Sequence, residues 1–297
     1  MSISFEEMLA AFAEDDTNEF WEAGRYDQAI TGLENSLRTA PARSKPAMQL
    51  KLSLCLRECG KPVEGSNLFS NTLKNLIEYP PTEELCSPIA EALCPIGEKY
   101  ISVDSVCKAG WIFRTAAELF HRTNDDAAAI VGIVKCLANI SSSNMNAYMY
   151  DAQKEQFLHD CVRSIHELIK SKDYFALFDH EPRRLASLYH DMAHSYSFIK
   201  KNTEEQHYYR SAVEALEKVY GIQASHLSHY GNLTHNLASS MMTNGQLKEA
   251  EELLRKASER QLAAQDWPSE ERKQSCLEKT RTLRETVAKR ISDLKNK

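Results

Sequence analysis

The chain has 297 residues, of which 42% are hydrophobic and 26% charged, a composition typical of a protein that forms a packed core. Its formal net charge of −6 at pH 7 argues against nonspecific nucleic-acid binding, which needs a basic surface. The sequence holds no apolar run of roughly 18 residues and begins with acidic residues where a targeting leader is basic, so we expect a cytoplasmic or nuclear protein without membrane insertion.

The eight cysteines are scattered and lack the short paired spacings of a zinc site or a disulfide framework. Cys55 and Cys59 share a helix face, but no second pair accompanies them. We therefore expect reduced thiols that pack as small apolar residues, with no metal and no other cofactor.

The first predicted element covers residues 10–43. A large residue, Phe20, is followed by Gly24, then by the small Ala29 and the large Leu33. This order of a large residue, a glycine, a small residue and a large residue returns along the chain, and it is typical of two helices joined by a tight turn.

The next two elements cover residues 46–79 and 90–123. In the first of them Gly60 is the turn residue, and the pair Pro80-Pro81 is expected to stop the second helix. In the second, Tyr100, the small Ala109 and the large Phe113 recur at the places of Phe20, Ala29 and Leu33, and Gly97 is a small residue of the first helix. Pro95 is expected to kink that helix or to leave one carbonyl unpaired.

Two less regular elements follow at residues 125–170 and 186–220. A polar break at residues 141–146 interrupts the first. Between the two elements, residues 173–182 are predicted to form a loop with a short aromatic turn. In the second element Glu205 stands where a small residue is expected, and its second helix is predicted to end at Gly221.

The clearest element covers residues 231–264. Apolar residues recur at helical spacing up to Asn244-Gly245 and again after it, which predicts a helix, a tight turn and a helix. Small residues such as Ala238 and Ala250 allow two antiparallel helices to approach closely. One such pair cannot bury its apolar face alone, so stacked neighbours are implied.

On these residues the chain resembles the tetratricopeptide repeats, a family with a period of about 34 residues, and the run NLA…G…EAE is most similar to the repeats of kinesin light chains. The resemblance implies an all-α fold: a right-handed superhelical solenoid of antiparallel helix pairs over residues 1–265. The charged stretch 266–297 is then expected to be a C-terminal capping helix.

The resemblance also implies which residues face a ligand, because fixed positions of each first helix line the concave groove of the superhelix in the family. In this sequence those positions place polar and imidazole groups along the groove, which suits recognition of a peptide or a helix. The predicted partner-binding residues are Asn18, Trp21, His190, His194, Asn232, His235, Ser239 and Met242.

A specialised mode of the family, the clamping of a chaperone's terminal carboxylate, is disfavoured here. Asn18 matches the clamp, but Glu14 replaces a lysine and would repel the carboxylate. Leu54 and Cys94 stand where further polar groups are needed.

Catalytic motifs are missing from the sequence: it holds no phosphate-binding glycine loop and no nucleophile elbow. His190 and His194 lie one helical turn apart, as in zinc proteases, but Asp191 replaces the glutamate of that motif and no third ligand follows at a known spacing. We therefore predict no catalytic residues, and we retain a zinc enzyme only as a disfavoured hypothesis.

Two binding hypotheses remain. The leading one is a non-enzymatic adaptor or scaffold that holds a partner peptide or helix in its groove. The alternative is a constitutive subunit of a larger complex, and the sequence does not separate the two because repeat scaffolds serve both functions.

Overall fold

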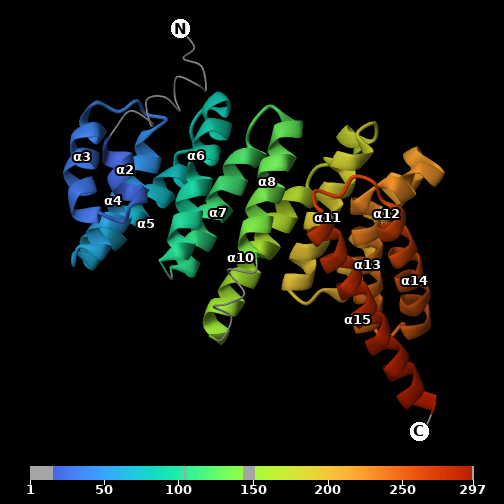
Figure 1. The fold of residues 1–297 in the computed structure, drawn as a ribbon. Helices are drawn as coiled ribbons and strands as arrows, with labels where there is room; N and C mark the ends of the chain where they lie inside the picture. The colour runs from blue at the N-terminus through green and yellow to red at the C-terminus, as the bar shows by residue number, and fades with distance from the viewer. Residues whose placement is uncertain (1–15, 104, 143–150, 296–297) are drawn as a thin grey trace. The chain divides into compact units, whose positions relative to one another are not determined.

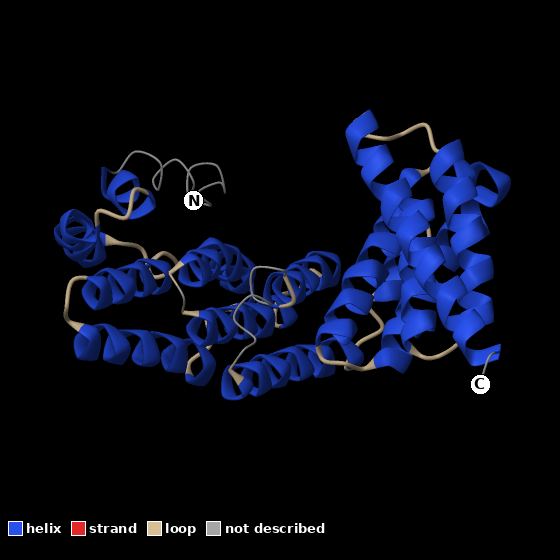
Figure 2. Cartoon of the chain, turned by 60° about the horizontal axis from the view of Figure 1, so that its bottom comes forward, coloured by secondary structure: helices blue, strands red, loops and turns tan. Residues whose placement is uncertain are grey.

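The structure is a computed structural model that describes residues 16–103, 105–142 and 151–295. Over these residues every regular element is a helix (Figures 1 and 2). The chain divides into two compact units, Met1–Tyr174 (unit 1) and Phe175–Lys297 (unit 2). The predicted all-α fold of paired helices is confirmed, and none of the described helices is both long and apolar enough to cross a membrane.

In unit 1, neighbouring helices pack as pairs, α2 with α3, α4 with α5 and α6 with α7, while α8 and α10 both pack on α7. The helices are α2 (Asp16–Glu22), α3 (Tyr26–Thr39), α4 (Lys45–Glu58), α5 (Pro62–Glu78), α6 (Glu83–Ser102), α7 (Val106–His121), α8 (Asp126–Ile140) and α10 (Ala152–Lys170).

Glycines allow the helices of unit 1 to touch. A Cβ added to Gly65 would lie 2.5 Å from the carbonyl oxygen of Ser53, across the α4–α5 contact. A Cβ on Gly97 would lie 2.7 Å from the ring of Phe113, across α6 and α7. The small residues that the repeat pattern predicts at these places therefore have a steric cause.

Helix α6 differs from the expectation at its start and in its course. It begins at Glu83, earlier than the element predicted from residue 90, and Glu83 and Glu84 in its first turn stabilise that end of the helix. It also continues through Pro88 and Pro95. Most of the polar break predicted at residues 141–146 lies outside the described residues.

In unit 2, α11 pairs with α12 and α13 with α14, α12 packs on α13, and α15 packs on α14 and α13. The elements are η1 (Phe175–Phe178), α11 (Pro182–Phe198), α12 (Asn202–Tyr220), η2 (Gly221–His226), α13 (Ser228–Thr243), α14 (Leu247–Ala263) and α15 (Glu270–Lys295). The short aromatic turn expected between residues 173 and 182 is the 3-10 helix η1.

The predicted turn between α13 and α14 depends on Gly245, whose φ of 78° is one that L residues rarely adopt. Helix α15 covers this pair: Val287 is fully buried, and Leu283 and Ile291 pack against the same apolar cluster. Most of its other residues are exposed and many are charged, which is the character expected of a capping helix.

Candidate functional site

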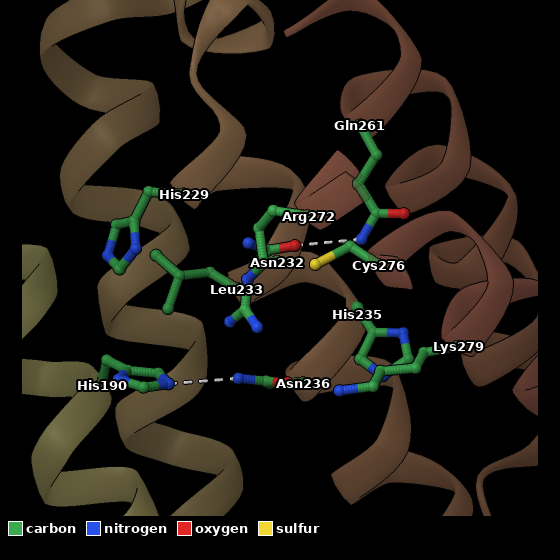
Figure 3. Close-up of a pocket in the computed structure, with 10 residues that line it drawn as sticks. All are labelled: His190, His229, Asn232, Leu233, His235, Asn236, Gln261, Arg272, Cys276 and Lys279. Carbon is green, nitrogen blue, oxygen red and sulfur yellow. Dashed lines mark hydrogen bonds between the residues drawn. The ribbon is translucent and has the colours of Figure 1, made fainter. Parts of the chain in front are cut away.

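A pocket of about 300 Å³ lies among α11, α13, α14 and α15 in unit 2 (Figure 3). Three of the predicted partner-binding residues, His190, Asn232 and His235, line it together. The full lining is His190, His229, Asn232, Leu233, His235, Asn236, Gln261, Arg272, Cys276 and Lys279.

Helix α13 supplies half of the lining because of its register. His229, Asn232, Leu233 and Asn236 follow one another at spacings of three, one and three residues, so they share one helix face. Gly231 lets this helix approach α14, since a Cβ there would lie 2.7 Å from the side chain of Gln261.

His190, on α11, is fixed through both ring nitrogens. Its Nδ1 lies 3.4 Å from a carboxylate oxygen of Asp191, and its Nε2 lies 3.2 Å from the amide nitrogen of Asn236 (Figure 3). When the Asn236 amide donates to Nε2, the imidazole carries its proton on Nδ1, beside Asp191. The link joins α11 to α13.

A hydrogen-bonded chain joins α13, α14 and α15 behind the pocket. His235 Nδ1 lies 2.9 Å from the hydroxyl of Thr280, this hydroxyl lies 2.9 Å from Gln261 Oε1, and Gln261 Nε2 donates to Asn232 Oδ1 at 3.1 Å. The single hydroxyl proton of Thr280 is donated to Gln261 or to the carbonyl of Cys276, so the oxygen accepts from His235 Nδ1–H. Gln261 and Thr280 are each 1% exposed, so this polar chain is part of the core.

The loop before α15 is tied down at three points. The Asp266 carboxylate accepts from the backbone N–H of Ser228 at 2.5 Å, and the Gln265 N–H donates to the carbonyl of His226. The Trp267 indole N–H donates to the carbonyl of Gln261. These bonds set where α15 begins, and hence where its side chains meet the pocket.

Two cations of α15, Arg272 and Lys279, complete the lining (Figure 3). They are seven residues apart, which is about two helical turns and places them on the same face. None of the described lining residues is acidic.

Burial favours the neutral form of two imidazoles of the pocket, those of His229 and His235. Burial, and then the neighbouring His190, lowers the pKa of His229 below its ordinary value. Burial, and then the ammonium of Lys279, lowers the pKa of His235. Arg272 and Lys279 are the arginine and lysine of the lining, and each carries a positive charge at neutral pH.

The other predicted residues are not in the pocket lining. His194 is exposed on α11, and Ser239 and Met242 are half-buried further along α13. The side chain of Asn18 and the whole of Glu14 lie outside the described part of the chain.

Trp21 requires a correction. Its side chain is 2% exposed in unit 1, where its ring meets that of Tyr26 edge to face at a centroid distance of 6.0 Å. The prediction that Trp21 lines an open groove is therefore wrong, because a large aromatic ring at this position contributes to the core.

Sequence reasoning missed seven of the lining residues: His229, Leu233, Asn236, Gln261, Arg272, Cys276 and Lys279. The spacing of His229 and Asn236 from Asn232 on one helix was a usable signal. The α15 residues gave no comparable signal, because their place depends on how α15 packs on α13 and α14.

Unit 1 has a different hollow, of about 470 Å³, formed by α5 and α7. Its lining is mostly apolar and consists of Phe69, Ser70, Leu73, Lys74, Ile77, Glu78 and Trp111. The ring of Trp111 is 38% exposed and packs against Phe157 at a centroid distance of 5.5 Å. Among the described residues, no group of three or more His, Cys, Asp or Glu side chains is placed to hold a metal ion.

Comparison with known proteins gave no match to a family model and none to a curated protein. Among solved structures, the chain is similar to BtubC (BKLC) of P. vanneervenii, with 12% identity, 83% of this chain and 92% of that chain covered, and a TM-score of 0.42. It is also similar to the TPR-like repeats of a putative kinesin light chain of Podosopora anserina, with 19% identity, 76% and 99% covered, and a TM-score of 0.39.

A third similar structure is the TPR2AB domain of yeast Sti1 in complex with pHSP90, with 12% identity, 89% of this chain and 95% of that chain covered, and a TM-score of 0.26. The descriptions of the second and third of these structures name TPR-like repeats and a TPR domain.

Proposed function

We propose that the chain is a non-enzymatic adaptor that binds a partner polypeptide at the unit 2 pocket. The observation that carries this proposal is the convergence of polar side chains from four helices, without an acidic group, around one hollow of about 300 Å³. Amides, imidazoles and cations of this kind recognise the carbonyl groups and side chains of a peptide.

The lining is prepared for binding before a partner arrives. A hydrogen bond between His190 and Asn236 joins α11 to α13, and a hydrogen bond between Gln261 and Thr280 joins α14 to α15. A partner that meets groups already fixed in place loses less side-chain freedom on binding, which favours affinity.

Affinity purification of the tagged full chain tests this function. A variant with His190→Ala and Asn236→Ala is compared with wild type and with a control that carries His180→Ala, an exposed histidine outside the lining. We expect the captured amount of one partner, measured by quantitative mass spectrometry, to fall at least tenfold with the pocket variant. With the control variant the captured amount should stay unchanged. Retention of every partner by the pocket variant would refute the proposal.

A second candidate function, a constitutive subunit of a larger complex, is favoured by the hollow of unit 1. Trp111 is 38% exposed there, and Tyr79, which follows α5, is 75% exposed. Apolar groups of this size are commonly covered in an assembly. Trp111→Ser would then remove a partner that co-purifies at fixed stoichiometry, while the pocket variant would leave that partner in place.

A further inference from the structure

In the ranges that the structure describes, the two cations of the unit 2 pocket are not paired with a carboxylate, whereas some basic residues of the same region are. Arg281, on the same helix, lies 2.7 Å from a carboxylate oxygen of Glu278, and Arg255 on α14 pairs with Glu252 and Glu259. Within the described part of the chain, Arg272 and Lys279 have no such carboxylate partner. They are therefore free to neutralise charge on a bound group.

The wall facing these cations offers hydrogen bonds without adding negative charge. Two carboxylates lie near the pocket without lining it: Asp191 is beside His190 Nδ1, and Asp266 accepts from the backbone of Ser228. His229 Nε2 is buried and has no hydrogen-bond partner among the described residues, although the side chain lines the pocket. A buried polar atom without a partner is costly, and a ligand atom that pairs with it removes that cost.

The charge of the pocket distinguishes between two kinds of acidic ligand. A carboxylate carries one negative charge and would leave one of the two cations unneutralised. A phosphorylated serine or threonine carries a charge of about −1.5 to −2 at pH 7 and presents three acceptor oxygens. Such a group can contact both Arg272 and Lys279 and still accept a hydrogen bond from a third donor of the lining.

We propose that the unit 2 pocket, acting in the adaptor function proposed above, receives the phosphoryl group of a phosphorylated side chain of the partner polypeptide. Arg272 and Lys279 supply the two positive charges, and His229 together with the Asn232 and Asn236 amides supplies hydrogen bonds around them. Binding of the partner thereby depends on its phosphorylation.

Titration of the full chain with small probes tests this inference. The probes are N-acetyl-phosphoserine N-methylamide, its serine and glutamate counterparts, and inorganic phosphate, and the readout is the change in the histidine ring NMR signals. We expect saturable shifts of the His229 and His235 signals with the phosphoserine probe, and at least tenfold weaker binding of the glutamate and serine probes.

Matched variants identify the cations responsible. The double variant Arg272→Gln with Lys279→Gln is expected to bind the phosphoserine probe at least tenfold more weakly than wild type does. Lys289→Gln with Arg290→Gln, the same change of charge on exposed residues further along α15, is expected to leave its affinity unchanged. Because Arg272 and Lys279 are exposed at the surface, their replacement leaves the core intact, and an unchanged far-ultraviolet spectrum verifies this.

Four outcomes overturn the inference: no binding of the phosphoserine probe, equal binding of the glutamate probe, equal loss with both cation variants, or binding of inorganic phosphate as tight as that of the phosphoserine probe. The last outcome would indicate a free anion in place of a polypeptide.

The partner capture described above separates this inference from the adaptor function. If His190→Ala with Asn236→Ala removes a partner that phosphatase treatment and the Arg272 and Lys279 variant leave bound, the adaptor function stands and the phosphoryl ligand is wrong. If no pocket variant removes a partner, the adaptor function itself is wrong, whatever the small probes do.

Discussion

The helix contacts of unit 1 include glycines packed on aromatic rings, beside a buried hydrogen bond between Ser53 and Tyr100, whereas those of unit 2 include a buried chain of amides, a hydroxyl and an imidazole. In unit 1, Gly97 meets the ring of Phe113 and Gly132 meets that of Phe120. In unit 2, Gln261 and Thr280, each 1% exposed, form hydrogen bonds in the core, and Glu205 is 8% exposed. Both units use paired helices, but the chemistry of their contacts differs.

The two units also differ in the chemistry of their surface hollows. Unit 1 carries the apolar hollow around Trp111, and unit 2 carries the polar pocket with its two cations. Seven of the ten histidines of the chain belong to unit 2. One repeat pattern therefore supports two kinds of surface, and the difference lies in positions that the pattern leaves free.

The largest expected effect comes from the apolar core of unit 1. Phe113→Ala removes a fully buried ring packed on Gly97, and we expect it to lower the free energy of unfolding by about 3–5 kcal/mol. Urea denaturation measures the loss, and hydrogen exchange locates it in α6 and α7. A loss below about 1 kcal/mol would show that this contact does not hold unit 1 together, and Val63→Ala, at a 71% exposed site, is the control.

Removing the amide at the centre of the polar chain of unit 2 should cost less. Gln261→Ala removes one hydrogen-bond partner from Asn232 and one from Thr280, and we expect a loss of about 1–3 kcal/mol in the free energy of unfolding with faster hydrogen exchange in α15. The exposed Gln265 gives the matched control, Gln265→Ala. Unchanged exchange in α15 would mean that apolar contacts alone, such as that of Val287, hold α15 on α13 and α14.

A pH titration of stability tests a buried polar side chain of unit 1. His166 is 2% exposed, and burial, with a smaller contribution from Lys170, lowers its pKa to about 3 from an ordinary value of 6.5. The folded state therefore binds this proton less readily than the unfolded state does. The contribution of His166 to stability is complete above pH 6.5 and falls by at most about 1.4 kcal/mol per pH unit as the pH drops towards 3.

The variant His166→Gln does not titrate, so its stability should fall less steeply than that of wild type between pH 6.5 and 4. His180→Gln, at an exposed histidine of unit 2, should follow the wild-type curve. Parallel curves for wild type and His166→Gln, measured by urea denaturation at each pH, would contradict the assigned shift.

The smallest effect concerns a helix cap. The Asp125 carboxylate accepts from the backbone N–H of Ala128 at the start of α8, and Asp125→Ala is expected to cost about 1 kcal/mol. Thermal unfolding measures it, with Asp173→Ala, at an exposed loop residue, as the control. An effect equal to that of the control would show that the cap adds nothing to the apolar packing of α8.

Much of the fold followed from the sequence, because local signals determine it. The turn at Gly245, the stop at Pro80-Pro81 and the small residues opposite Phe113 depend on neighbours within one helix pair. The early start of α6 was missed because its first turns lie outside the part of the helix that the repeat pattern covers.

The candidate site followed only in part. His190, Asn232 and His235 were predicted together because fixed positions of first helices share a face. Arg272 and Lys279 were not predicted, since they reach the pocket through the docking of α15, which no local pattern encodes. The prediction for Trp21 was wrong because the repeat pattern assigns this position to the groove surface, whereas the side chain is buried by packing in unit 1.

Hydrogen exchange of the full chain, with and without a partner captured by affinity purification, tests the central claim most directly. The account predicts that the bound partner slows exchange in α11, α13 and α15, around the pocket that His190, His235 and Lys279 line. Protection confined to α5 and α7, with exchange in unit 2 unchanged, would contradict it and would assign partner binding to the apolar hollow of unit 1.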